Sequence, residues 1–141
     1  MLKGIPNIIS PELLKILSEM GHGDEIVIAD GNFPSTTCAK RLIRADGHNV
    51  PEILEAILTL IPLDTYSKSP VHLMGIVPGD TVVPTIWNEY ESIVKSYFPQ
   101  FTNFNSLERF DFYEKAKQSY AVIATSEKSL YANIILTKGV L

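Results

Sequence analysis

The chain has 141 residues, the length of one ordinary domain, and 45% of them are hydrophobic, so we expect a single domain over residues 1–141 with one sizeable core. Twelve Lys and Arg residues stand against 16 Asp and Glu, without a basic run to neutralise phosphates, which argues against a nucleic-acid partner. There is no apolar run of about 18 residues and no signal-peptide pattern at the N-terminus, so we expect no membrane span. Cys38 is the only cysteine, which excludes an internal disulfide and favours a cytoplasmic protein.

The first predicted helix begins at Ser10-Pro11-Glu12, which has the residue types of an N-cap, a first helical residue and an early acid. Apolar residues then recur at helical spacing until Gly21. After the turn 21–24, the β-branched run 25–30 is typical of a buried strand. This places His22 in the helix-to-strand turn and Asp30 at the far end of the strand.

The rest of the chain alternates strands with helices. Residues 31–41 are rich in turn-forming types, and Pro78-Gly79 follows another apolar run. The alternation predicts an α/β fold, layered around a central mixed, partly parallel sheet that is flanked by helices. The further expected strands are 42–45, 71–77, 121–124 and 133–137, and the further expected helices are 51–61, 86–97 and 109–119.

His22 is the first candidate for chemistry because it lies between two glycines that leave its imidazole little cover. A histidine there can titrate near neutral pH and transfer protons. A surface turn histidine without a role explains the same residue. His48 in a polar loop and His72 in an apolar run favour a structural role more strongly.

Other site types have weaker support in the sequence. A metal site assembled from His22, Asp24, Glu25 and Asp30 lacks zinc or calcium spacing. The surroundings of Cys38 match no nucleophile motif. The glycines form neither a phosphate loop nor a dinucleotide fingerprint. Asp30 at a strand end suits either a ligand-binding group or a turn-initiating residue. The tyrosines Tyr113, Tyr120 and Tyr131 are equally compatible with core packing.

Several strings resemble the L-fucose mutarotase branch of the ribose pyranase family. The similarity runs in order along nearly the whole chain, and its Gly-His-Gly-Asp-Glu and Arg-Phe-x-Phe-Tyr-Glu segments are specific. The matching segments are 4–6, 10–14, 20–25, 29–30 with 33–34, 43–47, 63–66, 108–114, and 131–136 with 138–139.

This resemblance implies an isomerase that opens and recloses a sugar ring by general acid and base catalysis, without a metal or organic cofactor. It also implies a homo-oligomer with the site near a subunit interface. The sugar would be L-fucose, with ribose or galactose as secondary substrates. The residues it implies are His22, Tyr113 and Tyr131 for catalysis, and Asp30, Asp64, Arg109 and Asn133 for holding the sugar.

Two departures from the family pattern bear on the site. Ala132 stands where the family usually has Gly, so the backbone from Tyr131 to Asn133 can be set differently. The stretch 79–87 is longer than in the shortest bacterial members, and the sequence does not place it. A non-catalytic sugar-binding module, or a structural protein with tyrosines as interface anchors, would use several of the same residues but would not need His22.

Overall fold

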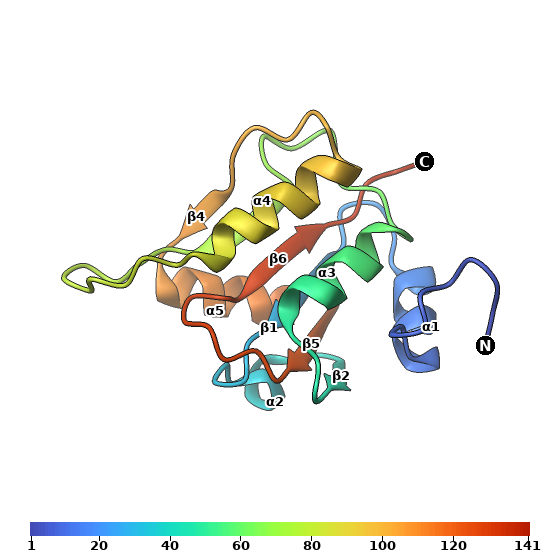
Figure 1. Cartoon of the computed structure of the whole chain (residues 1–141), viewed down its shortest axis with the longest axis horizontal. Coiled ribbons are helices and arrows are strands. Elements are labelled where there is room, and N and C mark those ends of the chain that lie inside the picture. The colour runs from blue at the N-terminus through green and yellow to red at the C-terminus, as the bar shows by residue number, and fades with distance from the viewer.

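A six-stranded sheet forms the centre of the protein in the computed structural model, which describes all of residues 1–141 (Figure 1). The strand order is β2-β5-β1-β6-β3-β4. All neighbouring strands are parallel except around β6, which runs antiparallel to both β1 and β3. The predicted mixed, partly parallel sheet flanked by helices is therefore confirmed. The strands are β1 (Glu25–Ala29), β2 (Leu42–Ala45), β3 (Val71–Met74), β4 (Asn105–Leu107), β5 (Ala121–Thr125) and β6 (Ile134–Thr137).

Helices cover both faces of the sheet, because alternate residues of the central strands point to opposite sides. On β1, Ile26 and Ile28 join the larger core cluster, and Val27 and Ala29 join the smaller one. The larger cluster contains residues of α1, α3 and α4, and the smaller one contains residues of α2 and α5. The helices are α1 (Pro11–Glu19), α2 (Ser35–Cys38), α3 (Val50–Leu58), α4 (Ile86–Tyr97) and α5 (Arg109–Gln118).

Local sequence sets where the two N-terminal long helices begin. The Ser10 hydroxyl accepts a hydrogen bond from the Leu13 N–H at 3.1 Å and so caps α1, whose first residue is Pro11. At α3, Asn49 and Glu52 exchange side-chain and backbone hydrogen bonds as a capping box. Helix α1 therefore starts where Ser10-Pro11 predicted, whereas α3 begins one residue before the expected Pro51 and ends at Leu58, before the expected position 61.

Three further elements differ from the sequence-based expectation. The predicted strand 71–77 ends already at Met74, because a turn follows in which the Asp80 N–H donates to the Val77 carbonyl at 3.0 Å. Gly79 adopts a φ of 90° in this turn. The short elements α2 and β4, of four and three residues, carry too little periodicity to have been predicted.

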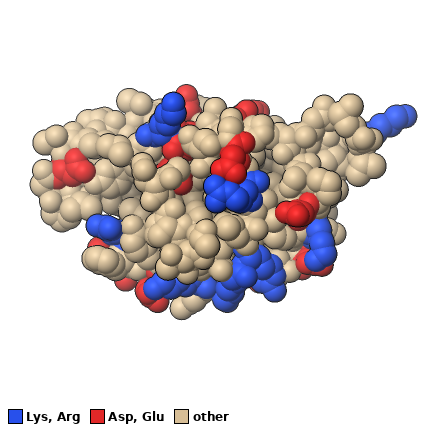
Figure 2. All heavy atoms as spheres, turned by 90° about the horizontal axis from the view of Figure 1, so that it is seen from below, with Lys and Arg blue, Asp and Glu red and all other residues tan.

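The surface mixes charges and leaves wide uncharged areas. Figure 2 shows Lys and Arg gathered along one edge of the face seen from below, with acidic groups beside them and mostly uncharged residues between. No helix is long and apolar enough to cross a membrane. Large apolar side chains are nevertheless exposed: Tyr66, Ile76, Val77, Val83, Tyr97, Phe110, Leu130, Val140 and Leu141, besides Met1 and Leu2.

Candidate functional site

His22 lies in the turn before β1 and contacts a buried carboxylate. Its Nε2 is 3.0 Å from Oδ1 of Asp64, while 44% of the His22 side chain and 8% of the Asp64 side chain are exposed. The backbone N–H groups of Tyr66 and Ser67 also donate to this carboxylate, at 3.1 and 3.2 Å. Burial alone would raise the pKa of Asp64, but these hydrogen bonds outweigh it and the pKa is lowered. Asp64 thus stays ionised and fixes the ring of His22.

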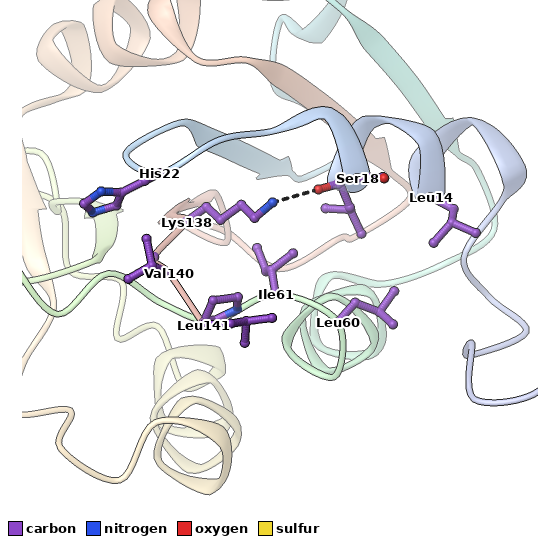
Figure 3. Close-up of a pocket in the computed structure, with 11 residues that line it drawn as sticks. Leu14, Ser18, His22, Leu60, Ile61, Lys138, Val140 and Leu141 are labelled. Carbon is purple, nitrogen blue, oxygen red and sulfur yellow. Dashed lines mark hydrogen bonds between the residues drawn. The ribbon is translucent and has the colours of Figure 1, made fainter.

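The turn that carries His22 is tied to the last strand. The Gly23 N–H donates to the Lys138 carbonyl at 2.8 Å, and the Lys138 N–H donates to the Asp24 carbonyl at 2.9 Å. The Lys138 ammonium donates to the carbonyls of Leu17 and Met20 at the end of α1. In Figure 3 a dashed line marks a hydrogen bond that the Lys138 ammonium makes.

A largely apolar cavity of about 430 Å³ extends from the His22 turn. In Figure 3, His22 lies at one end of it and Leu14 at the other. Its walls come from α1, from the chain after α3 and from the C-terminus. They consist of Leu14, Leu17, Ser18, His22, Leu60, Ile61, Pro62, Lys138, Gly139, Val140 and Leu141.

The other predicted site residues surround a second, more polar cavity of about 260 Å³. Asp30 follows β1 directly, and its backbone N–H donates to Oδ1 of Asn133 at 2.8 Å. Burial raises the pKa of the Asp30 carboxyl, although hydrogen bonds such as that from the Asn32 N–H oppose the shift. The cavity is lined by Asp30, Asn32, Phe33, Met74, Val77, Asp80, Arg109, Tyr113, Leu130, Tyr131 and Asn133.

The start of α5 supplies the cation of this cavity. Nε of Arg109 donates to the Tyr113 hydroxyl at 3.2 Å, one helical turn further on. The guanidinium also lies 5.4 Å from the ring centres of Phe110 and Tyr113. Glu108 caps the helix by accepting the N–H groups of Phe110 and Asp111, so the Arg109 side chain projects from a fixed helix end.

Tyr131 has the most unusual geometry of the cavity residues. Its φ is 56°, the only positive value at a non-glycine residue. Its hydroxyl donates to Oδ2 of Asp80 at 2.6 Å, and its carbonyl accepts the indole N–H of Trp87 at 2.8 Å. The following residue, Ala132, is fully buried, and its carbonyl accepts the Tyr90 hydroxyl at 2.6 Å. Alanine in the place of the family's usual glycine is thus accommodated in the core.

The structure divides the predicted site residues into two groups at opposite ends of the central strand β1. His22 and Asp64 lie beside the start of β1, where Asp64 N–H donates to the Thr137 carbonyl at 3.0 Å. Asp30, Arg109, Tyr113, Tyr131 and Asn133 line the cavity beyond the end of β1. A strand of this length separates its ends by roughly 15 Å. One chain therefore does not bring His22 to the second cavity.

Asp80 is the charged residue of the cavity that was not predicted from the sequence, because it belongs to the stretch 79–87 that the sequence left unplaced. The only available signal was the Pro78-Gly79 turn that precedes it. The pairing of His22 with Asp64 was also missed, since 42 positions separate the two residues and no local pattern joins them. No three His, Cys, Asp or Glu side chains converge as potential metal ligands.

An α/β fold with a small cavity beyond the carboxyl ends of its parallel strands, lined by apolar residues and several charged or polar side chains, is typical of proteins that bind small ligands. The chain belongs to the RbsD / FucU transport protein family, whose sequence pattern it matches over residues 3–141.

Relatives match over nearly the entire chain. The fucose mutarotase of Mus musculus is 52% identical, over 99% of this chain and 95% of its own. The crystal structure of the fucose mutarotase from Streptococcus pneumoniae in complex with L-fucose is 53% identical, covers 99% of both chains and has a TM-score of 0.93. The structure of FucU from Bifidobacterium longum is 56% identical, covers 99% of both chains and has a TM-score of 0.96.

Proposed function

We propose that this protein is an L-fucose mutarotase, an isomerase that interconverts the α and β anomers of L-fucose. The observation that carries the proposal is the full-length likeness to a fucose mutarotase that was crystallised with L-fucose. The residues of the chain support it independently, because the second cavity combines two carboxylates, two amides, two tyrosines and an arginine. Such a mixture supplies the acceptors and donors that buried sugar hydroxyls require.

The chemistry needs a proton delivered to the ring oxygen and a proton removed from the anomeric hydroxyl. The open aldehyde then rotates and recloses on its other face. In this proposal His22 delivers the proton, while Asp30, Arg109 and Asn133 hold the sugar. Asp64, to which the resemblance gave a role in sugar binding, orients the ring of His22 instead, because its Oδ1 lies 3.0 Å from Nε2. Each well-placed acid or base contributes roughly 10²–10⁴-fold. The uncatalysed reaction already proceeds in water, so this residue set suffices for a useful acceleration.

We infer that the protein is a homo-oligomer in which His22 of one copy approaches the second cavity of another. The separation of the two groups of residues within one chain supports this arrangement. Exposed apolar residues flank both: Tyr66 lies against His22, with ring centres 5.3 Å apart, and Val77 and Leu130 line the second cavity. An interface between copies would cover these side chains. We expect the protein to act in the cytoplasm.

The decisive experiment is magnetisation exchange between the anomeric protons of α- and β-L-fucose, with and without protein. The proposal predicts accelerated exchange that the His22→Ala variant loses by roughly 10²-fold or more. Because the His22 side chain is 44% exposed, this variant should keep its fold. A protein that binds L-fucose without accelerating exchange would instead be a sugar-binding module. Repeating the experiment with ribose and galactose tests the secondary substrates, since one apolar contact discriminates by only about 1–3 kcal/mol.

A further inference from the structure

Tyr131 is held in its strained conformation by one segment of the chain. Three hydrogen bonds reach it from residues 77–87: its hydroxyl accepts the Val77 N–H at 3.2 Å and donates to Asp80 at 2.6 Å, and its carbonyl accepts from Trp87. A left-handed backbone at a tyrosine persists only where the surroundings enforce it, and such positions cluster at functional sites. The long connection between β3 and α4 therefore serves to set Tyr131.

The loop that contains Asp80 orients the carboxylate of this residue toward Tyr131. The turn at Pro78-Gly79 places proline at its second position and a glycine with φ of 90° at its third, the residue types of a type II turn. Oδ1 of Asp80 accepts the Val82 N–H at 3.0 Å, which leaves Oδ2 for the hydroxyl of Tyr131. The carboxylate is thus oriented by its own loop.

The hydrogen bonds that the Tyr131 hydroxyl already makes determine which hydrogen bonds it can form with a sugar. A phenol has a single proton, and here that proton is directed at Asp80. This hydrogen bond raises the pKa of Tyr131 and lowers the pKa of Asp80, so the proton stays on the tyrosine in the free protein. Toward the cavity, the Tyr131 oxygen can therefore only accept a hydrogen bond.

We propose that Asp80 is a positioning residue that makes Tyr131 the proton acceptor for the anomeric hydroxyl. The inference rests on the proposed mutarotase function. As the ring C–O bond breaks and the ring oxygen takes a proton from the acid, the anomeric O–H proton passes to the Tyr131 oxygen. The former Tyr131 proton passes to Oδ2 of Asp80, and the anomeric C–O becomes the aldehyde C=O. Reclosure reverses each transfer, so no oxidant or co-reactant is required.

Other charged groups line the same cavity, but they are engaged differently. Asp30 lies beside Asn133, and Arg109 binds the hydroxyl of Tyr113. Neither forms a hydrogen bond with the Tyr131 hydroxyl, whose hydrogen-bond partners are Asp80 and the Val77 N–H. Asp80 is therefore the only carboxylate in position to receive its proton directly.

The test compares Asp80→Asn with wild type in the L-fucose exchange experiment. Asparagine can still accept the hydrogen bond from Tyr131 but cannot take up its proton. We expect kcat to fall roughly 10²-fold while KM changes less than about threefold. Asp80→Glu should recover part of the loss. Binding of 1-deoxy-L-fucose, which lacks the anomeric hydroxyl, should be unchanged by Asp80→Asn. The matched control is Thr81→Val, an exposed neighbour outside the cavity lining.

Tyr131→Phe completes the test, because residues that act as one unit show non-additive losses. The double variant with Asp80→Asn should be no slower than the slower single variant. If wild type is active, three results would overturn the role of Asp80 alone. The kcat of Asp80→Asn could lie within threefold of wild type, Thr81→Val could lose as much kcat as Asp80→Asn, or the losses could be additive in the double variant. A wild type without exchange activity would instead contradict the proposed function.

Discussion

The two carboxylates Asp30 and Asp64 are both buried, yet their environments shift their pKa values in opposite directions. Asp64 accepts three hydrogen bonds, one of them from the ring of His22, and its pKa is lowered in spite of burial. Asp30 has its pKa raised, because burial outweighs its hydrogen bonds. In the proposed mechanism, the ionised Asp64 orients His22, while Asp30 contacts the sugar in the second cavity.

The Asp64 shift predicts a defined pH dependence of stability. A carboxyl whose folded pKa lies below its unfolded value of 3.8 stabilises the fold above about pH 4 and loses that contribution as the pH falls through the lowered value. Wild type should therefore exceed Asp64→Asn in free energy of unfolding at neutral pH, with the difference shrinking below pH 4. Urea titrations at several pH values measure it. A difference that persists unchanged at pH 2–3 would contradict the prediction.

Asp30→Asn should have the opposite effect on stability while weakening sugar binding. When the pKa of a carboxyl is higher in the folded state than in the unfolded state, the group stabilises the fold fully at pH values below its unfolded pKa. This stabilisation is lost as the pH rises through the folded pKa. At pH 7 the asparagine variant should be more stable than wild type, and calorimetry should show L-fucose affinity lower by about 1–3 kcal/mol.

The control for Asp30→Asn is Asp46→Asn. The Arg44 side chain lowers the pKa of this exposed carboxyl, so its replacement should not stabilise the fold. A less stable Asp30→Asn protein with unchanged affinity would show that Asp30 serves the fold and not the ligand.

At the scale of the elements, α1 depends on a cation from another part of the chain. Its last turn contains no basic residue, and Lys138, directly after β6, donates instead to the carbonyls of Leu17 and Met20. Cations at a helix C-terminus satisfy free carbonyls and the helix dipole. The same lysine holds the His22 turn through its backbone.

Lys138→Met keeps most of the aliphatic stem and removes the ammonium group, so it should lower the free energy of unfolding by about 1–2 kcal/mol. Urea unfolding measures this loss. The control is Lys95→Met, which removes an exposed (i, i+4) pair with Glu91 on α4 and should change stability by less than about 0.5 kcal/mol. Equal effects of the two substitutions would contradict a capping role for Lys138.

Most elements were predictable because their signals are local. Ser10 and Pro11 marked the beginning of α1, Pro51 indicated α3 to within one residue, and runs rich in β-branched residues marked β1 and β5. The antiparallel direction of β6 and the partners of each strand depend on long-range pairing, which no local pattern encodes. For the same reason, residue types and the segments that resemble the family predicted His22 and Asp30 as site residues. Their separation in space, and the contact of Asp80 with Tyr131, could be seen only in the structure.

At the scale of the whole molecule, the surface carries apolar residues at both candidate groups. Val77 and Leu130 border the Asp30 cavity, and Phe110 lies next to Arg109 with 64% of its surface exposed. Tyr66, 79% exposed, and the apolar C-terminus flank His22. Since monomers rarely leave large contiguous apolar patches in water, contact between copies would bury both regions and bring His22 to a neighbouring cavity.

Mixed oligomers test whether the site is shared between copies. His22→Ala lacks the acid but keeps an intact Asp30 cavity, while Tyr131→Phe keeps His22 but has a defective cavity. Each variant alone should have strongly reduced exchange. If His22 acts on the cavity of another copy, co-expression of the two variants generates interfaces that combine a normal His22 with a normal cavity. Random assembly then restores about a quarter of the wild-type activity.

The mixing experiment requires two accompanying measurements. Light scattering coupled to gel filtration should give a mass that is a multiple of the 15.7 kDa chain, for wild type and for both variants. Mixing two His22→Ala preparations that carry different tags provides the control for mere co-assembly, and should restore nothing. Two results would mean that each chain works alone. The co-expressed variants could be no more active than the sum of the two separate variants, or a 15.7 kDa monomer could be fully active. His22 would then have to reach the cavity of its own chain through a rearrangement across the length of β1.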